Sequence, residues 1–133
     1  MNKFNVIKTI NLLDYGKFSD FPSKISQEDK KLRLFLQQPG IFGVHCVVTN
    51  RIYFQKCFNL DYCLASLTGD LRGHLFYACN DLAFDCDHHG FDSINYLILA
   101  IGNDCNSSEK RELKLREIKQ NCPYELYEET CFE

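Results

Sequence analysis

The sequence concentrates potential metal ligands in one short stretch, Asp85-Cys86-Asp87-His88-His89. Carboxylates, thiolates and imidazoles are the groups that bind zinc in proteins. This stretch lies in a predicted helix, where neighbouring side chains diverge by about 100 degrees, so adjacent residues do not converge on one ion. Only Asp85 with His88 or His89 could share a helix face. We therefore expect a structural helix here rather than a metal centre.

Cysteines are the second source of potential chemistry. There are eight of them: Cys46, Cys57, Cys63, Cys79, Cys86, Cys105, Cys122 and Cys131. No pair has the C-x-x-C spacing of a zinc or thioredoxin-like site, and no secretory signal precedes them, so we expect reduced thiols that pack as small hydrophobic groups. A cysteine-based redox or metal-binding protein is the weaker alternative, which an exposed thiol of low pKa would favour.

Length and composition restrict the class of protein. At 133 residues and 15.5 kDa, with 45% hydrophobic and 25% charged residues, the chain is expected to form one soluble domain around one core. No apolar run approaches the roughly 18 residues that cross a membrane, so we expect an intracellular protein of the cytoplasm or an organelle interior, not a secreted one. The net charge of -3 argues against strong autonomous DNA affinity, because DNA-binding domains usually carry a basic face.

Two strands and a turn form the predicted centre of the fold. Runs rich in Val, Ile, Phe and Tyr over residues 40–48 and 51–57 flank a short turn that contains Asn50, which is typical of a β-hairpin. A continuous apolar run over residues 93–101 predicts a further, central strand.

Helices are predicted around this hairpin. One begins near Ser26 and stops at Pro39-Gly40, and three more run over residues 60–68, 80–89 and 109–120. Gly69 is expected to end the helix that begins at residue 60, which leaves residues 70–77 as a loop. Near the N-terminus, a short strand is expected within residues 5–13. The order strand, strand, helix, helix, strand, helix predicts an α+β fold with a small three-stranded, mostly antiparallel sheet flanked by helices.

The predicted hairpin resembles the signature of the GIY-YIG nuclease family, with Gly40-Ile41-Phe42 and Tyr53-Phe54-Gln55 at the two tripeptide motifs. The later segments follow the family's order. They are a helix with Leu and Asp that ends in His and Gly (residues 80–90), a strand over 93–99, a helix with the pair Arg111-Glu112, and a Tyr-rich close at 124–127. The resemblance covers roughly residues 37 to 128, and it implies the GIY-YIG nuclease fold.

The resemblance also implies an activity. The family cuts a phosphodiester with a Tyr as base, an Arg, and one divalent metal held by a Glu, because the reaction needs an activated water and stabilisation of phosphate charge. Tyr53 matches the Tyr of the second motif. Glu112 matches the metal ligand, with Glu117 as an alternative on the same helix, and Mg²⁺ is the implied cofactor.

Three positions depart from the family's pattern: Phe42, Cys63 and Leu67 stand where the family has Tyr, Arg and His. Phenylalanine has no hydroxyl, and a thiol lacks the charge of a guanidinium. We therefore interpret the chain as an endonuclease-like protein with an eroded active site, which binds nucleic acid such as DNA, or a protein partner. An active metal-dependent DNA endonuclease with substituted residues is the alternative.

The expected organisation is an N-terminal extension and helix over residues 1–38, the GIY-YIG-like domain over 39–128, and a tail over 129–133.

Overall fold

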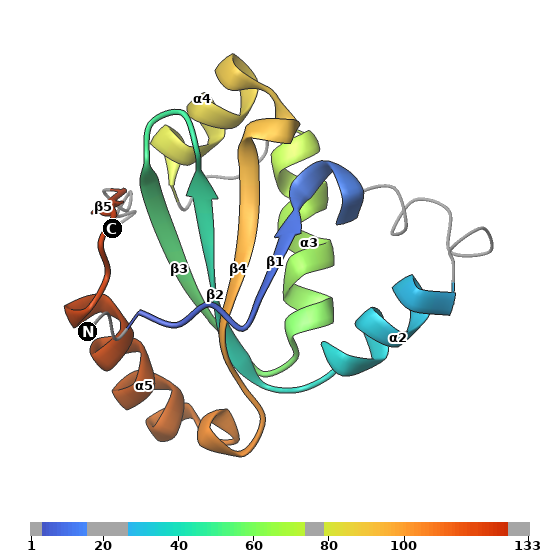
Figure 1. Cartoon of the computed structure of the whole chain (residues 1–133), viewed down its shortest axis with the longest axis vertical. Helices are drawn as coiled ribbons and strands as arrows, with labels where there is room; N and C mark the ends of the chain where they lie inside the picture. Colours follow the sequence, from blue (N-terminus) through green and yellow to red (C-terminus); the bar gives the residue numbers. More distant parts are fainter. Residues whose placement is uncertain (1–3, 16–26, 74–78, 128–133) are drawn as a thin grey trace.

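The computed structural model describes residues 4–15, 27–73 and 79–127, which form an α+β structure around one mixed five-stranded sheet (Figure 1). The strand order across the sheet is β1-β4-β2-β3-β5. The elements are β1 (Lys8–Asn11), α2 (Gln27–Phe35), β2 (Gly40–Cys46), β3 (Arg51–Cys57), α3 (Leu60–Arg72), α4 (Asn80–His89), the 3-10 turn η2 (Phe91–Ser93), β4 (Ile94–Ile101), the 3-10 turn η3 (Asn103–Cys105), α5 (Ser108–Gln120) and β5 (Glu125–Leu126).

The predicted hairpin and central strand are confirmed. β2 pairs antiparallel with β3 on one side, from Gly40 opposite Cys57 to Cys46 opposite Arg51, and with β4 on the other. Every residue of β2 is buried, because the strand lies between two neighbours and is covered on both faces. This explains its apolar, glycine-containing sequence.

The prediction of a three-stranded sheet is wrong, because the chain adds one short strand at each edge. β1 pairs antiparallel with β4, and β5 pairs parallel with the first two residues of β3, so the sheet is mixed. The two added strands have four and two residues. β1 is the short strand expected within residues 5–13, whereas β5 is too short to show the alternation of apolar and polar residues that identifies a strand in a sequence.

One helix boundary also differs from the prediction. α3 continues through Gly69 to Arg72 and is capped by Gly73, so residues 70–72 are helical rather than part of a loop. A Cβ at Gly69 would meet nothing within 4 Å, which shows that this glycine serves neither a turn nor a close contact. Its helix-breaking tendency of about 1 kcal/mol is overcome by the buried apolar face of α3.

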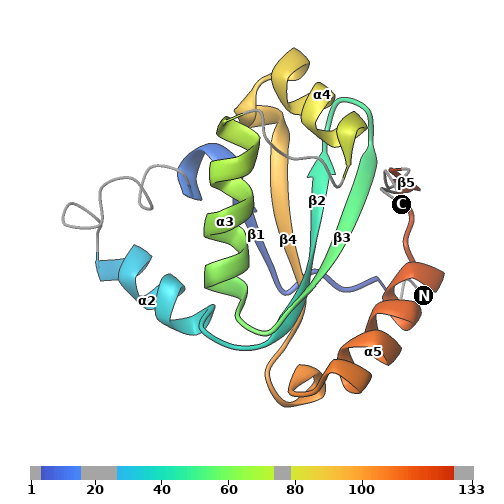
Figure 2. The ribbon, with the colours of Figure 1, turned by 180° about the vertical axis from the view of Figure 1, so that it is seen from behind.

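The sheet separates two hydrophobic layers. On one face, Phe42 and Val44 of β2 pack with Leu60 and Leu64 of α3, and α4 covers the end of the same face. On the other face, the apolar side of α5 packs on β2, β3 and β4. Figure 2 shows α3 crossing in front of the sheet, with α5 to one side. In the part of the chain that the structure describes, no helix is long and apolar enough to cross a membrane.

A buried carboxylate joins three elements at the hairpin-turn end of the sheet. Asp85 of α4 is only 3% exposed, and its Oδ2 accepts hydrogen bonds from Thr49 Oγ1 (3.1 Å), Arg51 Nη2 (2.9 Å) and Tyr127 Oη (2.7 Å). The guanidinium of Arg51 also lies over the ring of Tyr127, 4.5 Å from its centroid. These contacts hold α4 and the segment after β5 against the hairpin.

We predict that Tyr127→Phe lowers the free energy of unfolding by about 1–3 kcal/mol, because it removes a donor from a buried, charged acceptor. The matched control is Tyr62→Phe, whose residue is 63% exposed, and we expect a change below about 0.5 kcal/mol. Urea unfolding measures both values. Equal effects of the two substitutions would contradict the proposed importance of Asp85.

Candidate functional site

Tyr53 lies in β3 with its side chain toward the α3 face of the sheet, where it packs against the core. It also lines a groove of about 280 Å³ at the outer edge of β3. The other lining residues are Ile52, Phe54, Lys119, Leu126 and Tyr127. Tyr53, which matches the family's second-motif Tyr, is therefore half-buried beside a groove of mixed polar and apolar lining.

The three positions that depart from the family's pattern share this face of the sheet. Phe42 is fully buried and meets the ring of Tyr96 edge-on at a centroid distance of 6.0 Å. Cys63 and Leu67 lie on successive turns of α3, are 8% and 3% exposed, and belong to the same core cluster. The structure thus brings the positions together, but their side chains form a hydrophobic core instead of an open polar site.

Glu112 lies on the opposite face of the sheet from Tyr53. Successive side chains of a strand point to opposite faces, and Lys56, which faces α5 with Ile52 and Phe54, donates a short hydrogen bond to Glu112 Oε2. Arg116 Nε lies 3.9 Å from the other carboxylate oxygen. The sheet therefore stands between the two residues that retain the family's types.

The hydrogen bond from Lys56, with the positive charges of Lys56 and Arg116, holds the pKa of Glu112 below its usual range. Both carboxylate oxygens face cations of the chain itself. Among the described residues, no three His, Cys, Asp or Glu side chains converge to hold a metal ion. The residues around Glu112 thus do not fit a magnesium site, and magnesium binding stays a prediction.

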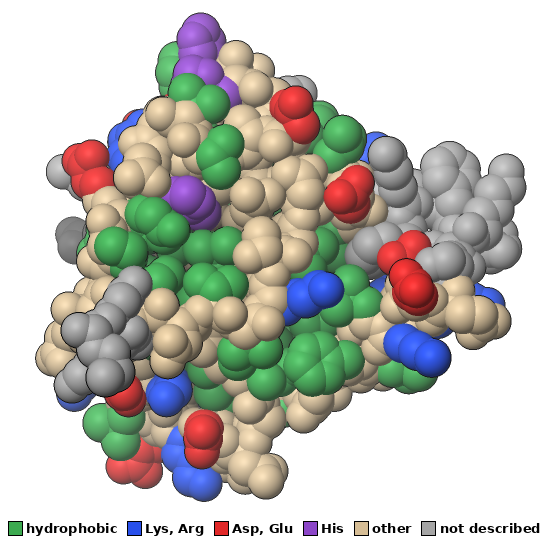
Figure 3. Space-filling view, in the orientation of Figure 1, with side chains coloured by type: hydrophobic (Ala, Val, Ile, Leu, Met, Phe, Trp, Pro, Cys, Tyr) green, Lys and Arg blue, Asp and Glu red, His purple; other side chains and the backbone are tan. Residues whose placement is uncertain are grey.

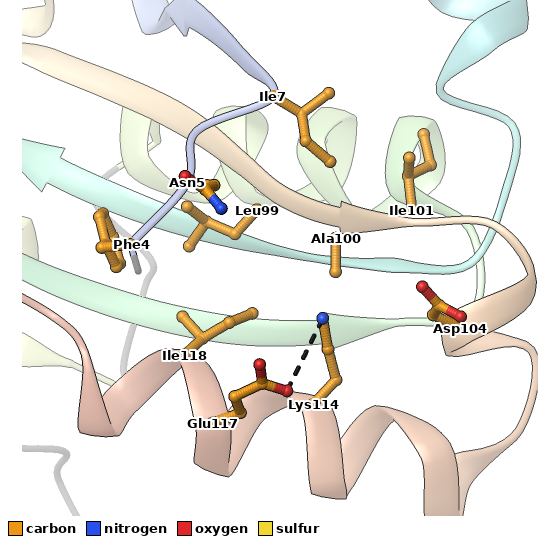
Figure 4. A pocket seen from close by; sticks show the side chains of 10 residues that line it. All are labelled: Phe4, Asn5, Ile7, Leu99, Ala100, Ile101, Asp104, Lys114, Glu117 and Ile118. Carbon is orange, nitrogen blue, oxygen red and sulfur yellow. Dashed lines mark ion pairs between the residues drawn. The ribbon is translucent and has the colours of Figure 1, made fainter. Parts of the chain in front are cut away.

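Glu117, the alternative metal ligand, lines a separate pocket. Its Oε2 lies 3.7 Å from Lys114 Nζ, as the dashed line in Figure 4 marks. The pocket has a volume of about 290 Å³ and an apolar floor from the N-terminal segment, β4 and α5. Its lining residues are Phe4, Asn5, Ile7, Leu99, Ala100, Ile101, Asp104, Lys114, Glu117 and Ile118. The sequence did not reveal it, because three distant segments form it.

The stretch from Asp85 to His89 is helical, as predicted, and its potential ligands diverge. Asp85 points inward to Arg51 and Tyr127, whereas His88 is exposed and stacks on Phe84 at a centroid distance of 5.5 Å. The two ends of this stretch therefore do not share a site.

Two of the cysteines lie near each other in the chain, where β3 passes into α3. Cys57 ends β3, Cys63 lies in the first turns of α3, and both are buried in the core cluster on the α3 face. The spacing of six residues matches none of the usual cysteine motifs. The seven described cysteines are all free thiols, and Cys131 lies outside the described residues.

Comparisons with known proteins found no matching family model, no similar curated protein and no similar solved structure.

We predict that Glu112→Gln removes part of the pH dependence of stability. The folded-state pKa of Glu112 is lowered, so its stabilising contribution is present above the unfolded-state pKa and is lost as the pH falls through the folded-state pKa. In urea unfolding, wild type should therefore exceed the variant at neutral pH and approach it at about pH 3. High salt should reduce the difference.

The control for this prediction is Glu125→Gln, because Glu125 is exposed and makes no ion pair with another described residue. We expect no acid-dependent difference for this variant. If the two substitutions behave alike, the contact between Lys56 and Glu112 does not form in solution.

Proposed function

We propose that this chain is a catalytically silent relative of the GIY-YIG nucleases that works as a binding module. The order β2-β3-α3-α4-β4-α5 supports the relationship, since it follows the succession of elements that the resemblance implies. The observation that carries the loss of catalysis is the complete burial of Phe42 at the position of the family's first tyrosine. A phenyl ring at 0% exposure contacts neither substrate nor water.

The remaining groups do not restore phosphodiester chemistry. Cleavage requires a base, a positive charge and a metal ligand that act on one phosphate. Tyr53 supplies one hydroxyl, but Cys63 is a thiol in place of the guanidinium, and Glu112 lies on the other face of the sheet from Tyr53, where it pairs with Lys56. An active endonuclease would therefore need a rearrangement that frees Glu112 and brings it to the Tyr53 face.

The open edge of β3 is the surface that best supports binding. Among the residues that the structure describes, β5 pairs with this edge at Arg51 and Ile52 only, and the Tyr127 amide donates to the Ile52 carbonyl. Because the two sides of a strand alternate, Ile52, Phe54 and Lys56 direct their amide groups outward, away from β2. Within the described residues, the amide groups of Phe54 and Lys56 on this side have no hydrogen-bond partner.

An extended protein segment is the partner that fits this edge. Such a segment adds a strand through its main chain and places alternate side chains in neighbouring pockets. The groove beside β3 is lined by Ile52, Tyr53, Phe54, Tyr127, the 45% exposed Leu126 and Lys119, so it would accept a side chain that has both apolar surface and a polar or acidic end. Continuation of the sheet beyond the short β5 is therefore the proposed mode of binding.

Nucleic acid is the second candidate, and α5 favours it. This helix carries five basic residues: Lys110, Arg111, Lys114, Arg116 and Lys119. Acidic groups of the same helix pair with Lys114 and Arg116, however, and Figure 3 shows blue and red side chains interspersed on the face that it presents. A net charge of -3 also opposes attraction to phosphates. These observations rank DNA behind a protein segment.

We predict that the purified protein does not cleave plasmid DNA with magnesium or manganese. Loss of one charge-stabilising donor costs about a hundredfold or more in rate, and loss of a general base costs about as much again. We expect the double variant Phe42→Tyr with Cys63→Arg to stay inactive as well, because both positions are buried. Metal-dependent cleavage by wild type that Tyr53→Phe abolishes would establish the endonuclease instead.

We also predict that hydrogen exchange alternates along β3. The amides of Phe54 and Lys56 should exchange faster than those of Tyr53 and Gln55, which bond to β2. Equal protection of neighbouring amides would show that the edge is already covered and would contradict the proposed mode of binding.

Two variants of Lys56 test the same edge with peptides of about ten residues selected from a random display library. Lys56→Pro removes the outward N–H without breaking the ladder to β2, and it should weaken peptide binding about tenfold, the effect of one lost hydrogen bond. Lys56→Ala keeps the N–H and should retain affinity. Equal binding by both variants, or stronger binding of single-stranded or duplex DNA than of any peptide, would refute strand addition.

A further inference from the structure

The open part of the β3 edge has different surroundings on the two faces of the sheet. Because successive side chains of a strand alternate, Phe54 and Lys56 point to the α5 face, whereas Tyr53 and Gln55 point to the α3 face. Figures 1 and 2 show α5 beside the lower part of β3. A strand added to this edge would also place its side chains alternately beside α5 and on the α3 face.

The charged side chains on the α5 face of this edge are mostly basic. Glu112, Arg116 and Lys119 follow one stripe of α5, because they are spaced by four and three residues. Lys56 donates a hydrogen bond to the Glu112 carboxylate, and Arg116 Nε lies 3.9 Å from its other oxygen. Among these four side chains, three positive charges therefore face one negative charge.

Lys119 is the charged residue that lines the groove beside β3. Its side chain is exposed and forms no ion pair with another residue that the structure describes. The other lining residues are aromatic or aliphatic: Ile52, Tyr53, Phe54, Leu126 and Tyr127. Apolar neighbours reduce the screening of charge by water, so an ammonium group in such a groove is a favourable partner for a carboxylate.

We propose that the partner at the β3 edge is an extended segment with acidic residues at alternate positions, one of which binds Lys119. The inference deepens the proposed strand addition and rests on it. Phe54 and Lys56 are two residues apart, so two acidic residues with the same spacing lie beside the groove and beside Lys56. The residue between them points to the α3 face, where an apolar side chain packs beside Tyr53.

A nucleic acid carries the same sign of charge but matches fewer features of this edge. The outward amides of Phe54 and Lys56 are spaced for the carbonyl groups of a strand, and a peptide carries these carbonyls and the carboxylates on one segment. The groove offers one unpaired lysine, whereas nucleic-acid binding depends on several phosphate contacts. The edge therefore favours an acidic protein segment.

Three matched peptides of about ten residues test the charge of the partner. They share a valine-rich, strand-forming sequence and differ only at two alternate positions, which are both Glu, both Gln or both Lys. In fluorescence anisotropy at low salt, wild type should bind the Glu peptide about fivefold or more tightly than the Gln peptide, and the Lys peptide most weakly. The preference should fade at about 1 M salt, where charges are screened within about 3 Å.

A charge reversal locates the contact. Lys119→Glu should reverse the order of the three peptides, so that the Lys peptide binds best. The matched control is Lys110→Glu, which changes the net charge of the chain by the same amount at the start of the same helix, outside the groove. The control should keep the wild-type order, and circular dichroism checks that both variants fold.

The contrary outcomes separate this inference from the proposed function. Equal binding of the Glu and Gln peptides, with Lys56→Pro still weakening both, would overturn the acidic partner and leave strand addition in place. An equal loss of preference in Lys119→Glu and Lys110→Glu would reveal general attraction between charges and would also overturn it. Absence of binding by all three peptides would overturn the inference, and failure of the library-selected peptides as well would refute the proposed function.

Two other occupants of the edge give their own results, and either would overturn the proposal. Dimerisation of the free protein in analytical ultracentrifugation that Lys56→Pro abolishes would assign the edge to a second copy of the chain. Protection of the Phe54 and Lys56 amides from hydrogen exchange in the free monomer would assign it to residues 128–133 of the same chain, which include Glu128, Glu129 and Glu133.

Discussion

Burial of β2 on both faces is the constraint on which the rest of the structure depends. The strand lies between β3 and β4, and every one of its residues is buried. At Gly43 a Cβ would lie 2.6 Å from a methyl group of Ile52, so neighbouring side chains occupy the space that any larger residue would need. A position in this strand is selected for packing, and Phe42 is therefore part of the core rather than of a site.

Buried carboxylates fasten the outer elements to this central unit. Asp85 holds α4 and Tyr127 to the hairpin. Asp61 of α3 likewise joins α3 to Tyr15 and to α2. Asp61 accepts a hydrogen bond from Tyr15 Oη at 2.7 Å and pairs with Arg33 of α2 at 3.2 Å. α2 contains no fully buried residue, so this ion pair and the packing of the partly buried Leu32 against the core both attach the helix. A buried acceptor that loses such donors is costly, which makes these sites intolerant of change.

The sequence predicted the elements that have strong local signals. The hairpin, the apolar strand β4 and the helix α4 followed from β-branched residues, a continuous apolar run and a terminal glycine, Gly90, which adopts φ +90°. The sequence predicted a short strand where β1 lies, but it predicted neither the pairing of β1 with β4 nor the strand β5, because both depend on distant partners rather than on local residues.

The candidate site was less predictable than the fold. The sequence shows that Phe42 lacks a hydroxyl, but not that the sheet separates Tyr53 from Glu112, since that depends on which face α5 covers.

The origin of the two edge strands has a consequence for how the chain assembles. The hairpin closes a short loop, whereas the edges require Lys8 to meet Ile98 and Arg51 to meet Glu125. Long loops close slowly, and non-local pairing lowers folding rates. During synthesis on the ribosome, β3 therefore keeps its whole outer edge exposed until residues 125–126 emerge. Unpaired edge strands pair with one another, so this topology makes newly made chains prone to aggregate through β3 before folding is complete.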